Sequence, residues 1–216
     1  MDRKLIVIEG ACDGVGKTTQ YEMLIEHLKK DGFSVTSHHF PSNNEYQGLL
    51  VKNYLDGNFG EIKELSPYFL NMLYAADRGV TWYQELKEKY ENKDMIVLDR
   101  YTTSSLIYQS ALIEDIDERK RFIDYVIDFE YNKIGIKRPD NVIFLYASFD
   151  LIVKLISNRK GKKDLHESNK EYMKKVYDNA MFVADYLSWN KIKCNNGDVM
   201  RDKEEIHAEI YKIIGR

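Results

Sequence analysis

The chain has 216 residues and a net charge of −3, with 32 basic and 35 acidic side chains mixed along its length. This length suffices for one α/β domain with a substantial core, and no linker divides it, so we predict a single domain over residues 1–216. The charge argues against a dedicated nucleic-acid binder. No segment approaches the roughly 18 apolar residues of a membrane span, and Cys12 and Cys194 form no disulfide or metal pattern. We therefore expect a cytoplasmic protein.

Five short apolar runs predict strands at residues 4–9, 33–40, 94–99, 141–147 and 191–194. The first, third and fourth are nearly continuous, which is typical of parallel strands buried on both faces. The alternation with helical segments predicts an α/β fold, a five-stranded parallel sheet with helices on both faces, and ligands beyond the carboxyl ends of the strands. Residues 167–189 have a helical pattern, and further helical stripes lie at Tyr21, Leu24, Ile25 and Leu28, at Phe122, Tyr125, Val126 and Phe129, and at Ile206, Ile210, Ile213 and Ile214.

The segment IEGACDGVGKTTQ, residues 8–20, lies between the first predicted strand and the first helix. Phosphate-binding loops have the pattern Gly, four residues, Gly-Lys-Ser/Thr, and Gly16, Lys17 and Thr18 supply its second half. Ala11 occupies the place of the first glycine, and Gly10 lies one residue too early. We predict that the loop works, because Ala11 is tolerated wherever that position keeps a negative φ.

The loop residue types fit a nucleoside triphosphate. Gly14 and Gly16 let backbone N–H groups approach phosphate oxygens, and the helix adds its positive amino-terminal end. Lys17 can reach the β- and γ-phosphates, and the Thr18 hydroxyl can ligate Mg²⁺. Cys12 is interpreted as a small side chain that fits rather than as a redox group. We assign ATP to Ala11, Cys12, Asp13, Gly14, Val15, Gly16, Lys17, Thr18 and Thr19.

The third predicted strand ends in LDRYTTSSLIYQ, which places an acid and an arginine beside the loop. Asp99 can hold Mg²⁺ or steer an acceptor, and Arg100 can bridge donor and acceptor phosphates as charge shifts between them. A strand-end salt bridge is the structural alternative. The segments NKIG and NKIK lack the aspartate of a guanine-reading motif, which disfavours a GTPase.

In this order and spacing, DGVGKTTQ, HFP, LYAADR and LDRYTTSSLIYQ resemble the thymidylate kinase family, over essentially the whole chain. The resemblance implies a P-loop nucleoside monophosphate kinase that transfers the γ-phosphate of ATP to dTMP with Mg²⁺, and it suggests a homodimer. A deoxynucleoside kinase that phosphorylates a sugar hydroxyl, and a nucleotide-binding regulatory protein without transfer activity, are the alternatives.

Position by position, the resemblance also implies roles for individual residues. Asp13 matches the aspartate near the acceptor's sugar and phosphate, Asp99 and Arg100 match the catalytic pair, and Arg78 matches the arginine that hydrogen-bonds the base. Tyr74 stands where the family usually has a phenylalanine that stacks on thymine, although its apolar helix alone would suggest core packing. The dTMP set implied is Asp13, Phe40, Pro41, Tyr74, Arg78, Arg100, Ser104, Ser105, Tyr108 and Gln109.

Two segments depart from the family pattern. FPSNN, residues 40–44, lacks the arginine that often points at the acceptor phosphate. The basic segment SNRKGKKDLHE, residues 157–167, is predicted to be the lid, either catalytic or a solvated charge run. Because Gly14 replaces a loop arginine, the chain resembles the branch with lid-borne basic residues, with Arg159 as the catalytic cation and Lys163 as the alternative. His38, His39 and His166 are interpreted as structural.

Overall fold

The computed structural model describes residues 4–43, 45–157 and 170–215. A five-stranded sheet in the order β2-β3-β1-β4-β5 lies at its centre, and all neighbouring strands are parallel. The predicted α/β fold is confirmed, and the ends of the predicted strands agree to within two residues. The strands are β1 (Leu5–Gly10), β2 (Val35–His39), β3 (Met95–Asp99), β4 (Asn141–Tyr146) and β5 (Asn190–Lys193).

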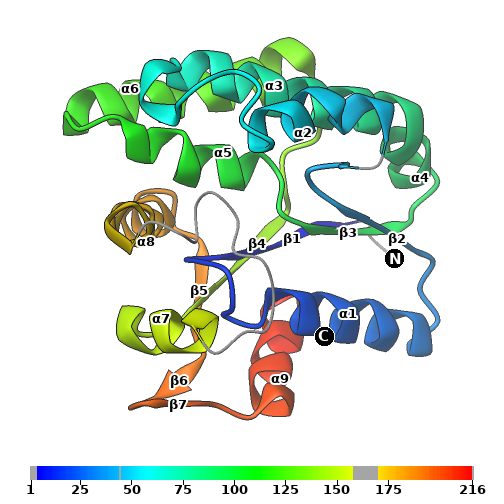
Figure 1. Ribbon diagram of the computed structural model, residues 1–216. Helices are drawn as coiled ribbons and strands as arrows, with labels where there is room; N and C mark the ends of the chain where they lie inside the picture. Colours follow the sequence, from blue (N-terminus) through cyan, green and yellow to red (C-terminus); the bar gives the residue numbers. More distant parts are fainter. Residues whose placement is uncertain (1–3, 44, 158–169, 216) are drawn as a thin grey trace.

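Helices cover both faces of the sheet (Figure 1). On one face lie α1 (Lys17–Lys30), α7 (Phe149–Ser157) and α9 (Lys203–Ile213). The other face carries α2 (Leu49–Leu55), α3 (Pro67–Thr81), α4 (Lys87–Glu91), α5 (Thr102–Tyr108) and α6 (Ile116–Ile127), with α8 (Lys170–Tyr186) packed against α5. Single 3₁₀ turns occur at Tyr46–Gly48, Ile62–Glu64 and Ser110–Leu112.

Alternating side chains of the central strand enter two different cores. Ile6 and Ile8 pack in the core that α1 and α9 share, whereas Leu5 and Val7 pack with Trp82 on the other face. All four strand residues have no exposed surface. Burial on both faces is therefore the reason why this strand has no polar alternation.

Two helices change to a wider π-helical turn at their carboxyl ends, α3 into η3 (Trp82–Leu86) and α6 into η5 (Asp128–Ile134). The predicted stripe of α6 is wrong at Tyr125, which lies before the second change, and the second change alters the helix from Asp128 onward. Phe122 and Val126 are buried as expected, but Tyr125 is 39% exposed, and Glu130 is completely buried. A π turn adds one residue to the turn, so it rotates the following side chains relative to an α-helical pattern.

The remaining segments follow the sequence pattern more loosely. After β5 comes a small antiparallel hairpin of β6 (Asn195–Asn196) and β7 (Val199–Met200). The long predicted helix of residues 167–189 is described from Lys170 and ends at Tyr186. Apart from Ser157, the predicted lid, with Arg159, Lys163 and His166, lies outside the described residues. Within those residues, no helix is long and apolar enough to cross a membrane.

Candidate active site

The loop between β1 and α1 shows why its glycine comes one residue early. A Cβ on Gly10 would lie 2.8 Å from Val15 Cγ1 and 2.9 Å from Lys17 Cδ, so the glycine gives the Lys17 stem its space. Ala11 is buried, is not among the described non-glycine residues with positive φ, and donates its N–H to the Leu145 carbonyl at 3.0 Å. The departure from the usual pattern therefore causes no strain.

Further along the loop, the backbone takes the conformation that glycine permits. Gly14 has φ 83° and Gly16 φ 93°, both in the left-handed region. Thr18 is exposed in the first turn of α1. Burial, followed by the charge of Asp13, raises the pKa of the Cys12 thiol to about 12, which favours the interpretation of Cys12 as a small side chain that fits.

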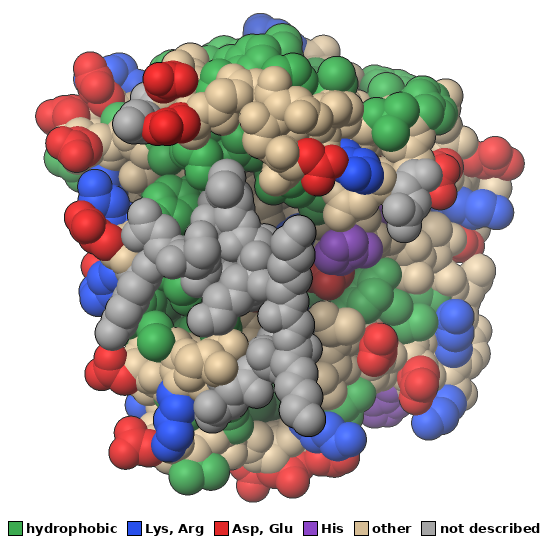
Figure 2. All heavy atoms as spheres, in the orientation of Figure 1, with side chains coloured by type: hydrophobic (Ala, Val, Ile, Leu, Met, Phe, Trp, Pro, Cys, Tyr) green, Lys and Arg blue, Asp and Glu red, His purple; other side chains and the backbone are tan. Residues whose placement is uncertain are grey.

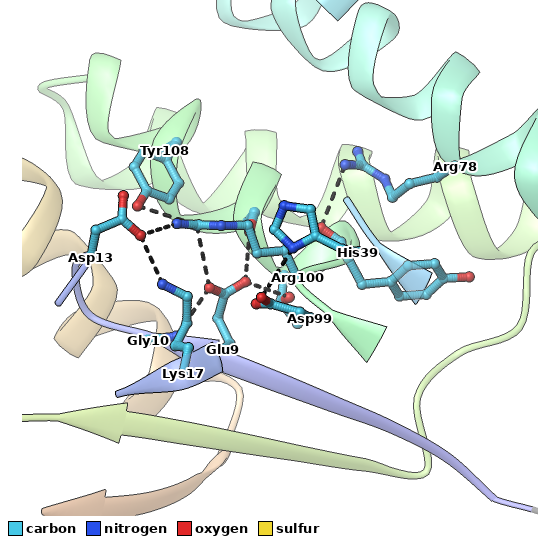
Figure 3. A network of polar contacts seen from close by, with 12 residues as sticks. Glu9, Gly10, Asp13, Lys17, His39, Arg78, Asp99, Arg100 and Tyr108 are labelled. Carbon is cyan, nitrogen blue, oxygen red and sulfur yellow. Dashed lines mark hydrogen bonds and ion pairs between the residues drawn. The ribbon is translucent and has the colours of Figure 1, made fainter. Parts of the chain in front are cut away.

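Two cations meet at one carboxylate. The Oδ1 atom of Asp13 accepts a hydrogen bond from Lys17 Nζ at 2.8 Å and another from Arg100 Nη2 (Figure 3). Arg100 also reaches the Tyr108 hydroxyl at 3.3 Å. The sequence predicted all four residues for the site, and the fold brings them together. An incoming phosphate can replace Asp13 as the partner of both cations.

Glu9, which sequence reasoning missed, contacts this cluster through its buried carboxylate. Its buried carboxylate accepts the Gly10 N–H at 3.0 Å and the hydroxyl groups of Thr103 and Ser104 at 2.8 and 2.6 Å. It also lies 3.7 Å from Arg100 Nη1. A carboxylate at the end of a doubly buried apolar strand was the signal available in the sequence, because a buried charge needs partners.

Asp99 has one occupied and one unoccupied oxygen. His39 Nδ1 lies 3.0 Å from Oδ2, whereas the buried Oδ1 has no hydrogen-bond partner among the described residues. Burial raises the pKa of Asp99, but the hydrogen bond from His39 and the charges of Lys17 and Arg100 outweigh burial and keep that pKa below its ordinary value. His39, interpreted from sequence as structural, therefore holds a site carboxylate.

These oxygen donors fit Mg²⁺. The unpartnered Asp99 oxygen and the exposed Thr18 hydroxyl are hard ligands, and the described residues contain no cluster of three or more histidine, cysteine, aspartate or glutamate side chains that could hold a metal ion. Mg²⁺ is usually bound by one or two carboxylates together with water and substrate phosphates, so a sparse protein donor set suits it.

A cavity of about 210 Å³ adjoins the cluster. All ten residues predicted for dTMP line it, so the fold brings the whole predicted set together. Tyr172, Met173 and Val176 of α8 also line it, which the sequence did not predict. Among the described residues, the only cations that line the cavity are Arg78 and Arg100, so no described cation takes the place of the arginine missing from FPSNN.

The segment after β2 is fixed from two sides. Ser42 donates its backbone N–H to Asp77 Oδ2 at 2.8 Å, and its hydroxyl lies 2.8 Å from His38 Nε2. A Cβ on Gly48 would lie only 2.0 Å from the Ser42 carbonyl oxygen, so glycine is required for this close approach. Phe40 and Pro41 are thus held in the wall of the cavity.

Comparisons with known proteins show which proteins this chain resembles. Residues 8–210 match the family model described as thymidylate kinase. The chain is 33% identical over 214 residues to a probable thymidylate kinase of Methanococcus aeolicus, covering 97% of this chain and 94% of that protein. It is 30% identical over 212 residues to a probable thymidylate kinase of Thermococcus onnurineus, covering 97% and 96%. The solved structure of thymidylate kinase from Candida albicans has a TM-score of 0.75 at 23% identity, covering 99% of this chain and 91% of that chain.

Proposed function

The chain belongs to the thymidylate kinase family and is an ATP-dependent kinase that phosphorylates dTMP to dTDP, and we propose that Lys17, Asp99 and Arg100 carry this reaction. One observation supports this assignment most strongly. Lys17 and Arg100 meet at Asp13, and two of these three residues line the cavity that also contains the predicted base-binding residues.

The proposed reaction needs positioning and positive charge more than covalent help. The loop N–H groups and Lys17 hold the β- and γ-phosphates of ATP, and an oxygen of the dTMP phosphate attacks the γ-phosphorus. The bond from that phosphorus to the β–γ bridging oxygen breaks, and ADP leaves. Arg100 stabilises the charge on the moving phosphoryl group, after the two phosphates have replaced Asp13 as the partner of both cations.

We propose Mg²⁺ as the cofactor, held by Thr18 and Asp99. The unpartnered Asp99 oxygen supports this choice. When bound, the ion neutralises phosphate charge. His39 orients Asp99 by occupying one carboxylate oxygen, which leaves the other oxygen available to an ion.

We further propose a homodimer in the cytoplasm. Four large apolar side chains are exposed on two neighbouring helices, Tyr68 and Met72 on α3 and Ile116 and Tyr125 on α6. Figure 2 shows hydrophobic side chains gathered over this part of the molecule. A second copy of the chain would cover them. Cys12 and Cys194 are free and buried, which suits a reducing compartment.

The lid assignment of Arg159, with Lys163 as the alternative, stays a prediction. Gly14 occupies the loop position at which one branch of the family carries an arginine. The catalytic cation would then come from the segment that follows α7.

The first experiment measures ADP release from ATP and Mg²⁺ with dTMP, thymidine, dUMP, dCMP or AMP as acceptor. We expect fast turnover with dTMP, little with thymidine because its hydroxyl brings no phosphate to Arg100, and none after EDTA removes divalent cations. Turnover with thymidine but not dTMP would identify a deoxynucleoside kinase. ATP binding without turnover on any acceptor would identify a regulatory protein and overturn the proposed function.

A further inference from the structure

Arg78 and Glu130 form a buried ion pair beside the cavity. Arg78 is 1% exposed and Glu130 is 0% exposed. Arg78 Nε donates to Glu130 Oε2 at 2.7 Å, and Nη2 donates to Oε1 at 2.6 Å, so the guanidinium is held by two parallel bonds. Buried ion pairs contribute little net stability compared with apolar residues of similar volume, so stability alone does not account for this pair.

Arg78 also forms a hydrogen bond with a residue of the cavity wall. Nη2 also donates to the Ser105 hydroxyl oxygen at 2.8 Å, and Ser105 lines the cavity. A guanidinium can only donate, so the Ser105 oxygen is the acceptor and its own hydrogen stays available for a second bond. No described residue accepts that hydrogen. Arg78 Nη1 makes only a long contact of 3.4 Å to the Tyr101 carbonyl.

Glu130 reaches this position because α6 changes to the π-helical segment η5 before it. Its Oε2 atom accepts a second hydrogen bond, from Thr102 Oγ1 at 2.7 Å. Every side-chain partner of Glu130 is therefore a donor, and both carboxylate oxygens act as acceptors. The two parallel bonds to Glu130 fix the plane and the direction of the Arg78 guanidinium.

We propose that Glu130 is the positioning residue that sets the base specificity of the acceptor site, an inference that rests on the proposed function. By fixing Arg78 and, through it, the Ser105 hydroxyl, Glu130 makes this end of the cavity present hydrogen-bond donors. A thymine carbonyl oxygen accepts from these donors. The 4-amino group of a cytosine base meets them with its own hydrogens and is rejected.

The matched pair of acceptors is dTMP and 5-methyl-dCMP, because both carry the 5-methyl group and they differ only in the donor and acceptor pattern at positions 3 and 4. In Glu130→Gln, one end of the side-chain amide is a donor facing the Arg78 N–H groups, so at most one of the two parallel bonds can remain. We expect KM for dTMP to rise by about tenfold and kcat at saturating dTMP to change by less than about threefold. The ratio of kcat/KM for dTMP to that for 5-methyl-dCMP should fall by at least about tenfold.

Thr102→Val is the control, because it removes a hydrogen bond to the same Glu130 oxygen and leaves both Arg78 bonds in place. Thr102→Val should leave the ratio of kcat/KM for dTMP to that for 5-methyl-dCMP unchanged. A folded Glu130→Gln enzyme with an unchanged ratio, or an equal fall in Thr102→Val, would overturn the proposal. If Glu130→Gln does not fold, the ratio is measured in Ser105→Ala, where it should also fall, and an unchanged value there would overturn the proposal.

Calorimetry separates this inference from the proposed function. The dissociation constants of dTMP and 5-methyl-dCMP are measured for the wild type and for Glu130→Gln without any turnover. Absence of turnover with dTMP would overturn the proposed function, while the ratio of the two dissociation constants would still test Glu130. We expect that ratio to converge toward one in the variant, and equal ratios in both proteins would overturn the inference.

Discussion

Arg100 reaches Asp13, Tyr108 and Glu9 from a backbone with φ 65°, in the left-handed region that non-glycine residues rarely adopt. Its backbone N–H is held by the Ile8 carbonyl at 3.1 Å. A strained backbone persists only where its surroundings determine it, and such positions gather at functional sites. The fold therefore directs this guanidinium at the end of the phosphate loop.

Replacing Arg100 by lysine tests this direction, because lysine keeps the charge but not the planar fork. We expect kcat to fall by about 10²-fold while KM for ATP changes little, since Arg100 acts on the moving phosphoryl group. Arg119→Lys is the control, because Arg119 bonds the Ile113 carbonyl in another part of the chain. Steady-state kinetics of both variants and of the wild type test this prediction. Equal kcat values for Arg100→Lys and the wild type would show that Arg100 does not act in the chemical step.

At this scale, sequence predicted the residues that belong to local patterns. Lys17 follows from its loop motif, and Asp99 and Arg100 follow from the end of a buried strand. Glu9 and Glu130 were missed because their partners lie far away in the sequence, 94 positions for Glu9 and Thr103 and 52 for Glu130 and Arg78. The sequence alone does not reveal contacts between positions so far apart.

Among the elements, strands were easier to predict than the local form of helices. Strands buried on both faces leave continuous apolar runs, which fix both their position and their type. A π turn changes the rotation of a helix by one residue without changing its composition. For this reason the burial of Glu130 could not be read from the spacing of apolar residues.

Helices α1 and α9 are joined by a pair of histidines. His27 Nδ1 lies 2.9 Å from His207 Nε2, the Tyr211 ring stacks on His27, and the Tyr211 hydroxyl bonds Asp31. His207 is 8% exposed, and its Nδ1 has no partner among the described residues. Burial, followed by the charge of His27, lowers the pKa of His207.

This lowered pKa gives a prediction for stability. The unfolded chain binds a proton at His207 near pH 6.5, where the folded chain does not, so the free energy of unfolding should fall as pH drops below about 6.5. His207→Gln should make the urea midpoint less dependent on pH between about 7.5 and 5.5. Equal slopes in both proteins would show that His207 does not contribute.

At the scale of the whole molecule, the parallel sheet was predictable but its strand order was not. An apolar run specifies burial and leaves open which strand lies beside it, and here β3 inserts between β2 and β1. That insertion brings Asp99 and Arg100 next to the phosphate loop, with Ile8 paired to Asp99 in the register of the two strands. The site is thus a consequence of strand order, which only the folded chain shows.

The exposed apolar side chains of α3 and α6 carry the last prediction. Tyr68 and Tyr125 contact each other edge to face at 4.9 Å, and Met72 is 47% exposed on the same helix as Tyr68. Burying such a surface against a second copy removes apolar area from water, at about 25 cal/mol per Å². Sedimentation should therefore give twice the chain mass of 25.5 kDa.

A charge within this surface should separate the two copies, because it would be buried without a partner. We expect Met72→Glu to sediment as a monomer at micromolar concentration. Val199→Glu is the matched control, since Val199 is 69% exposed on β7, away from α3 and α6 in Figure 1, and it should leave the mass unchanged. If the wild type sediments as a monomer, these helices do not pair two copies, and if both variants dissociate, the contact lies elsewhere.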